Sequence, residues 1–259
     1  MPSSALEPPP SSASPSRLTA LHQRRLAQVW RSAGWPCLDA IELDLLAVGC
    51  LSRHWDEQGR QTLRVTDQGI QVLAAKRRRH QAALSAHEGL VGQVVREMHR
   101  AGRVVWRGLS LRAPLPAESG ATQWALAMPD VFSIRHTSVE DYAEPVVHEI
   151  KVSRSDLRAD LQKAHKGAAY LALSSQCWYV LARGIADLEE VPVSFGVMLA
   201  DEHGLEVARP APRRAMRLPF VVWIALARAA AELHEDSEQC LLGSESPPSS
   251  GLAAEEGLL

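Results

Sequence analysis

Two short apolar runs decide the fold of this chain: MPDVFSI at residues 128–134 and PVVHEIK at residues 145–151. Both are rich in Val, Ile and Phe, which is typical of buried strands in one sheet. Because side chains alternate between the faces of a strand, Glu149 and Lys151 share one face, and His148 and Ile150 lie on the other. Asp130 stands near the start of the first strand. Charges near a core are costly unless they are paired, and a divalent cation held by the two carboxylates would supply such pairing.

These residues also form a recognisable motif. Pro129-Asp130, separated by eighteen residues from Glu149-Ile150-Lys151, resembles the motif of the PD-(D/E)xK nuclease superfamily. The segment VSRSDLRAD at residues 152–160 is more specifically similar to the MmcB-like DNA-repair family, as are residues 177–180, 195–201 and 204–207. The resemblance covers roughly residues 85–230.

The resemblance implies a metal-dependent DNA nuclease that acts in DNA repair or DNA processing. Asp130 and Glu149, helped by the carbonyl of Ile150, would then hold Mg²⁺ or Mn²⁺. Lys151 would position or activate the attacking water, whose pKa the metal lowers.

Related nucleases often bring one more acid to the metal from the first helix of the domain, which is expected here over residues 86–101. Glu88 is the candidate because it lies at the edge of the apolar face of that helix, and Glu97 at the other edge is the alternative. An ordinary solvated glutamate is the competing interpretation for each.

A single long helix is expected after Lys151, with several polar and basic residues that could contact DNA phosphates. These candidates are Ser153, Arg154, Arg158, Lys163 and Lys166. Each phosphate that is neutralised would contribute about −0.9 to the salt slope of binding. The competing interpretation is an ordinary solvated surface.

The first part of the chain has a different pattern. Helices are expected over residues 17–33, with Ser16 as N-cap, and over residues 38–48. A hairpin with Gly59 at the bend follows over residues 51–65, and Thr66 caps the next helix, which ends at the basic residues 76–79. The segment LRVTDQG at residues 63–69 resembles the wing-to-helix junction of winged-helix domains.

In a winged-helix domain, three arginines of the predicted hairpin would position DNA: Arg53, Arg60 and Arg64. The alternative is a docking or dimerising domain that has kept the fold without reading DNA.

The order of elements predicts an α/β fold, a restriction-endonuclease-like sandwich with a mixed central sheet flanked by helices. A small winged-helix-like α+β domain precedes it. The expected domains are a disordered arm (1–15), the winged-helix-like domain (16–82), the nuclease-like domain (83–243) and a disordered acidic tail (244–259). Residues 111–122 are expected to form a loop, 176–182 a strand, 193–207 a hairpin and 219–233 a helix.

Composition is compatible with this organisation. The four cysteines form no CxxC pair, and the longest apolar run, residues 220–227, is too short to span a bilayer. We therefore expect a cytoplasmic protein without a membrane partner. Residues 1–82 hold eleven Lys/Arg against seven Asp/Glu, and residues 221–259 hold one against seven. A basic front half suits DNA contact, although a solvated surface would look the same.

Two other function classes remain open. The first is a catalytically silent DNA-binding or repair-scaffold protein, and the second is a winged-helix transcription regulator. A charge cluster of Asp130, Glu149 and Lys151 argues against the first, since a silent site has no need of it. The sequence is also compatible with a homodimer and with other repair proteins as partners.

Overall fold

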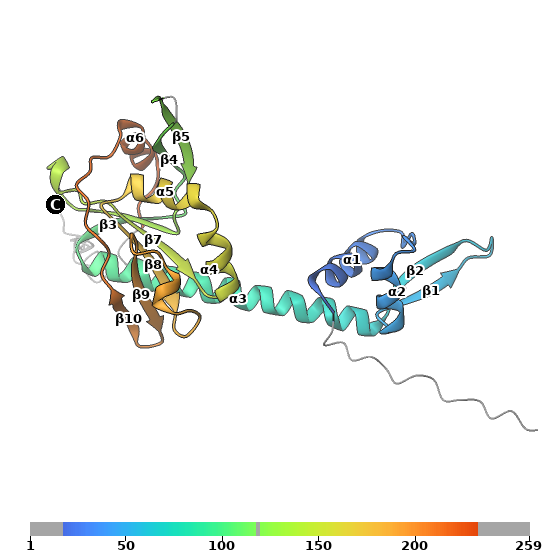
Figure 1. The fold of residues 1–259 in the computed structure, drawn as a ribbon. Coiled ribbons are helices and arrows are strands. Elements are labelled where there is room, and N and C mark those ends of the chain that lie inside the picture. Colours follow the sequence, from blue (N-terminus) through green and yellow to red (C-terminus); the bar gives the residue numbers. More distant parts are fainter. Residues whose placement is uncertain (1–17, 118–119, 233–259) are drawn as a thin grey trace, which may run out of the picture. The chain divides into compact units, whose positions relative to one another are not determined.

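The computed structural model describes residues 18–117 and 120–232 (Figure 1). Contacts divide the chain into two compact units, Met1–Ser85 and Ala86–Leu259, whereas the sequence places the division at residues 82/83. The expected arm over residues 1–15 and the expected tail over residues 244–259 lie outside the described residues, as do the last residues of the domain expected over 83–243.

The first unit is built from two short helices, a hairpin and the start of a long helix, in the expected order. Its elements are α1 (Ala20–Arg31), α2 (Ala40–Ala47), β1 (Leu51–Trp55), β2 (Gln61–Val65) and α3 (Asp67–Arg100). Thr19, and not Ser16, caps α1 through reciprocal contacts with His22. Thr66 caps α3 as predicted, because its hydroxyl accepts a hydrogen bond from the backbone N–H of Gly69.

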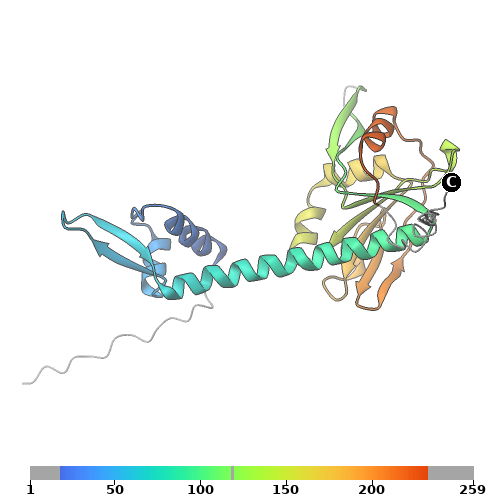
Figure 2. The same ribbon diagram turned by 180° about the vertical axis from the view of Figure 1, so that it is seen from behind.

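Helix α3 is the first correction to the sequence analysis. Two separate helices were expected, one ending near residue 79 and one over residues 86–101, but α3 runs unbroken from Asp67 to Arg100 (Figure 2). No proline interrupts this stretch, and the residues at the expected break are Gln81, Ala82, Ala83 and Leu84. Most of these are strong helix formers, so the local propensity continues the helix through the division between the units.

The second unit is organised on a mixed six-stranded sheet with the order β10-β9-β8-β7-β6-β3. Its strands are β3 (Arg103–Arg107), β6 (Val131–Arg135), β7 (Val146–Lys151), β8 (Gln176–Ala182), β9 (Gly196–Asp201) and β10 (Gly204–Arg209). Strands β7, β8 and β9 are parallel, and the remaining pairs are antiparallel. The predicted strands and the C-terminal hairpin are confirmed.

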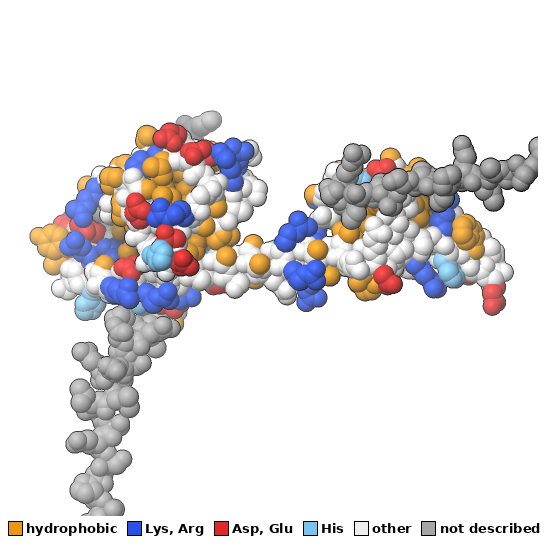
Figure 3. Space-filling model, turned by 90° about the horizontal axis from the view of Figure 1, so that it is seen from below, with side chains coloured by type: hydrophobic (Ala, Val, Ile, Leu, Met, Phe, Trp, Pro, Cys, Tyr) orange, Lys and Arg blue, Asp and Glu red, His pale blue; other side chains and the backbone are white. Residues whose placement is uncertain are grey.

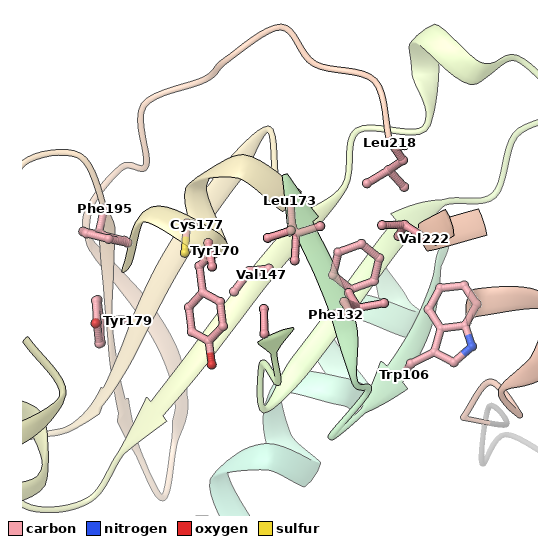
Figure 4. Close-up of a cluster of buried hydrophobic side chains, with 14 of the residues drawn as sticks. Trp106, Phe132, Val147, Tyr170, Leu173, Cys177, Tyr179, Phe195, Leu218 and Val222 are labelled. Carbon is pink, nitrogen blue, oxygen red and sulfur yellow. The ribbon is translucent and has the colours of Figure 1, made fainter. Parts of the chain in front are cut away.

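Helices cover both faces of this sheet. They are the second half of α3, α4 (Arg154–Leu161), α5 (Ala164–Leu173) and α6 (Phe220–Arg228). On one face, Val91 and Val94 of α3 pack against Ile150. On the other face, Tyr170 and Leu173 of α5 join Phe132 of the sheet in a second core (Figure 4). The α/β class, with a mixed sheet flanked by helices, is therefore confirmed.

Two further expectations in this unit are wrong. The single helix expected after Lys151 is broken at Gln162–Lys163 into α4 and α5. The loop expected over residues 111–122 contains the strand β4 (Leu111–Pro116), which pairs with β5 (Thr122–Ala127) in a separate hairpin. Pro114 and Pro116 argue against a strand in general, but a two-stranded hairpin has a free edge on which a missing N–H costs nothing.

None of the described helices has the length and apolar character needed to cross a bilayer.

Gly34 ties the turn after α1 to the hairpin. Its φ is +78°, its carbonyl accepts the N–H of Leu63 at 2.7 Å, and a Cβ added to it would lie 2.1 Å from the Leu63 oxygen. Gly59 has a similar φ of +73°, but a Cβ added there would meet no atom within 4 Å.

We expect Gly34→Ala to destabilise the hairpin well beyond the roughly 1–2 kcal/mol that a left-handed backbone costs alanine, because a backbone clash adds to that strain. Gly59→Ala supplies the matched control, which bears the backbone strain alone. Hydrogen exchange of residues 51–65 measures the difference, and equal protection in the two variants would contradict this account.

His148 is buried on the α3 side of β7, and both ring nitrogens lack a hydrogen-bond partner among the described residues. Burial, with a smaller contribution from Arg103, lowers the pKa of His148 from 6.5 to about 3. Between these values the unfolded chain binds a proton that the folded chain does not. The free energy of unfolding should therefore fall as the pH drops through this window, at most by about 1.4 kcal/mol per pH unit.

His148→Leu removes this titration, so we expect a shallower loss of stability between neutral pH and about pH 4. Urea denaturation across that range measures it. A pH slope equal to that of the wild type would show that His148 does not titrate in this way.

Candidate functional site

The end of β7 brings two charged side chains together, as the alternation along the strand predicts. The Lys151 Nζ lies 2.6 Å from the Glu149 Oε1, and both residues are at most 5% exposed. Such an ion pair is stable inside a protein only when further hydrogen bonds satisfy its remaining polar atoms.

Helices α4 and α5 provide those further contacts. The Lys166 ammonium of α5 donates to Glu149 Oε1 and to Asp160 Oδ1, each at 2.5 Å. The Tyr179 hydroxyl of β8 donates to the other oxygen of Asp160 at 3.1 Å. The result is a buried network of two carboxylates and two ammonium groups, in which Lys151 also lies 3.8 Å from Asp160.

The carboxylates of this network stabilise the charged form of Lys166. Burial lowers the pKa of the Lys166 ammonium, but the neighbouring Glu149 and Asp160 carboxylates outweigh it and raise the pKa above its ordinary value. Lys166 is therefore a cation at neutral pH. The sequence predicts that Lys166 contacts phosphate, and in the structure its ammonium pairs with Glu149 and Asp160. The helix pattern could not predict the ion pairs of Lys166, because its partners Glu149 and Asp160 come from β7 and α4.

Asp130 joins the site from the residue preceding β6. Its Oδ2 accepts a hydrogen bond of 2.7 Å from the backbone N–H of Ile150, which holds the carboxylate against the end of β7. The His87 Nε2 of α3 lies 3.4 Å from the same oxygen. Sequence reasoning missed His87, because it considered only acids on that helix.

The Tyr170 hydroxyl lies beside the carboxylates of the site. It donates to the carbonyl of Met128 at 2.8 Å, and its aromatic ring lies under the Lys166 ammonium, 5.2 Å from it. Burial raises the pKa of the Tyr170 hydroxyl above its ordinary value. Three surrounding carboxylates, those of Glu149, Asp130 and Asp160, raise it further.

One atom of the site is unsatisfied: the buried Glu149 Oε2 has no hydrogen-bond partner among the described residues. A cation would satisfy it. The described part of the chain contains no group of three or more His, Cys, Asp or Glu side chains that could hold a metal ion. This donor set does not suit a closed zinc site, but it suits Mg²⁺, which commonly takes one or two carboxylates and completes its shell with water and phosphate.

The acids proposed on α3 lie at its surface. Glu88 is 59% exposed in its side chain and lies 3.6 Å from His87, while Glu97 pairs with Arg100. The contacts of the described residues thus connect Asp130 to His87, and connect Glu88 to the site only through that imidazole.

Most of the basic residues proposed for DNA contact near the site have other partners. Arg154 and Arg158 both bind the Glu190 carboxylate, at 2.6 and 3.1 Å. Ser153 caps α4 by accepting the N–H of Asp156. Lys163 is exposed at the start of α5 and has no ion pair among the described residues.

The three hairpin arginines do not form one surface. The register pairs Arg53 with Leu63 and Ser52 with Arg64, so Arg53 and Arg64 point to opposite faces of the hairpin. Arg60 pairs with Asp56 at 2.8 Å in the turn. The hairpin is thus less suited to positioning a duplex than the sequence predicts.

Substitution of Asp160 tests whether the network of ion pairs stabilises the fold around the site. Asp160→Ala removes the carboxylate that Tyr179 binds and leaves both ammonium groups with Glu149 as their single buried counter-charge. We therefore expect it to lower the free energy of unfolding by about 3 kcal/mol or more. Asp156→Ala, on the same helix but with a side chain 56% exposed and 3.7 Å from Lys151, should change it by less than about 1 kcal/mol. Urea denaturation measures both, and similar losses would contradict the assignment.

Comparison with known proteins adds little to this description. No protein-family model matches the chain, and no curated protein matches it significantly. Among solved structures, the chain is similar to the SPO1766 protein of unknown function from Silicibacter pomeroyi, with 22% sequence identity and a TM-score of 0.37. The similarity covers 52% of this chain and 77% of that chain, and at this level it carries no functional information.

Proposed function

We propose that this protein is a metal-dependent DNA nuclease of the PD-(D/E)xK type, which hydrolyses phosphodiester bonds in DNA repair or DNA processing. The observation that carries the proposal is the buried Glu149 carboxylate, one oxygen of which has no hydrogen-bond partner among the described residues. It lies beside Lys151, and the next backbone N–H along the strand, that of Ile150, holds Asp130. A buried, incompletely satisfied carboxylate is expensive for a fold that does not use it.

Asp130, Glu149 and the carbonyl of Ile150 would hold Mg²⁺ or Mn²⁺. The bound metal would supply a water of lowered pKa and stabilise the charge that develops on the phosphate. Lys151 would orient the nucleophilic water by hydrogen bonding, since its ammonium is fixed against Glu149. The Ile150 N–H holds Asp130 in place, and His87 limits how far that carboxylate can turn.

Asp160 makes the site able to exchange partners. If a cation were held by Glu149, the Lys166 ammonium would still have the Asp160 oxygen, which lies 2.5 Å from it. Lys166, whose side chain is 28% exposed, would therefore keep an ion pair in either state.

The same ion pairs also favour a second candidate, the catalytically silent DNA-binding protein. Two ammonium groups already contact Glu149 Oε1, and such neutralisation is what a site without a metal requires. Metal titration separates the two functions, because the silent protein would bind neither Mg²⁺ nor Mn²⁺ at this site.

Glu149→Gln preserves the shape of the side chain and removes its charge. We expect cleavage of DNA to fall by about 100-fold or more, with DNA binding retained, because the lost group acts on the reacting phosphate and its metal. Plasmid, single-stranded and branched DNA are incubated with Mg²⁺ or Mn²⁺, and calorimetry follows metal binding by the same preparations.

Glu202→Gln is the control, since its carboxylate is 85% exposed in the turn after β9. It should cleave and bind metal like the wild type. Full cleavage by the Glu149→Gln protein would overturn the proposed function.

A further inference from the structure

Four consecutive basic residues on α3, Lys76 to Arg79, form what we call the basic turn. All four are exposed and lie in the first unit. Lys and Arg side chains stand out along α3 in the space-filling view (Figure 3). Among the described residues, none of the four has an ion pair.

The sequence around the basic turn explains this. A helical residue reaches partners three or four positions away, which here are residues 72–76 and 79–83. None of those residues is acidic, and no acid occurs between Asp67 and Glu88. Lys76 and Arg79 are also three positions apart, so their like charges oppose the helix. The basic turn is thus a region of uncompensated positive charge.

Several other exposed arginines, in contrast, have carboxylate partners. Arg60 pairs with Asp56, Arg154 and Arg158 share Glu190, and Arg183 binds two carboxylates. These pairs cancel much of the charge that the sequence suggests for those surfaces. A polyanion would meet a stronger field at the basic turn than at the paired arginines.

From these observations we infer that the basic turn binds the phosphate backbone of duplex DNA without reading its sequence. Consecutive helical residues point in directions about 100° apart, so the four side chains surround the helix and leave no apolar face for insertion into a bilayer. Arg79 also lines a hollow of about 320 Å³ with Gln23, Gln68 and Gln71. Their amides can donate to phosphate oxygens, which is how proteins fix their register on a duplex.

This inference rests on the proposed function only for the identity of the polyanion. It places DNA binding in the first unit, on the basic turn of α3 and not on the hairpin arginines. Binding is measured without divalent metal, so that the result does not depend on whether the protein cleaves DNA.

The test replaces Lys76, Arg77, Arg78 and Arg79 by Gln in the full chain, since Gln keeps the helix propensity. Binding to a fluorescent duplex is measured by anisotropy over a range of KCl concentrations. We expect affinity to fall about tenfold or more at low salt. The slope of log K against log[salt] should become shallower by about 2, since about two of the four side chains can face one duplex. Circular dichroism confirms that the helix content is unchanged.

A control variant loses the same total charge from four exposed arginines that have carboxylate partners. Those residues, each changed to Gln, are Arg100, Arg183, Arg213 and Arg217. Its salt slope should stay close to that of the wild type.

Three outcomes would overturn the inference: an unchanged slope in the basic-turn variant, an equal loss in the control, or a loss of binding to phosphatidylserine vesicles with DNA binding intact. A shallower slope in a protein that never cleaves DNA would leave the inference standing and remove the proposed function.

Discussion

The second unit depends on how one buried negative charge is neutralised. Glu149 lies inside the protein at the end of β7, and two ammonium groups, from Lys151 and Lys166, bind the same oxygen. Asp160 then balances the second of these cations and takes a hydrogen bond from Tyr179. Strands β7 and β8 and helices α4 and α5 are therefore joined by charge as well as by apolar contact. Losing either carboxylate leaves the two ammonium groups with a single counter-charge between them.

The local part of this arrangement was predictable. Strand alternation places Glu149 and Lys151 on one face and His148 on the other, and apolar runs mark β6, β7 and β8. The partners were not predictable, because they depend on tertiary contacts. Arg154 and Arg158 lie more than thirty residues from Glu190 in the sequence, yet they bind it. His87 reaches Asp130 only because α3 packs on the sheet.

The errors in secondary structure have related causes. Local propensity joins the two expected helices into α3, although contacts divide the chain within it. The reverse happens after Lys151, where apolar periodicity continues through residues 162–163 but the helix breaks. Asp160 and Lys166 lie on either side of that break and form an ion pair across it. In each case the pattern was right about the helix type and wrong about where the helix ended.

The prolines of β4 have a consequence for the protein in concentrated solution. Trp124 and Leu126 of the partner strand β5 are 49% and 68% exposed, so this hairpin is an apolar element at the surface. A free strand edge beside such side chains would invite strands from other molecules. Pro114 and Pro116 are two positions apart, so their nitrogens face the same edge, and neither offers an N–H. The β4 edge of the hairpin thus resists the addition of another strand, which is a common protection against aggregation.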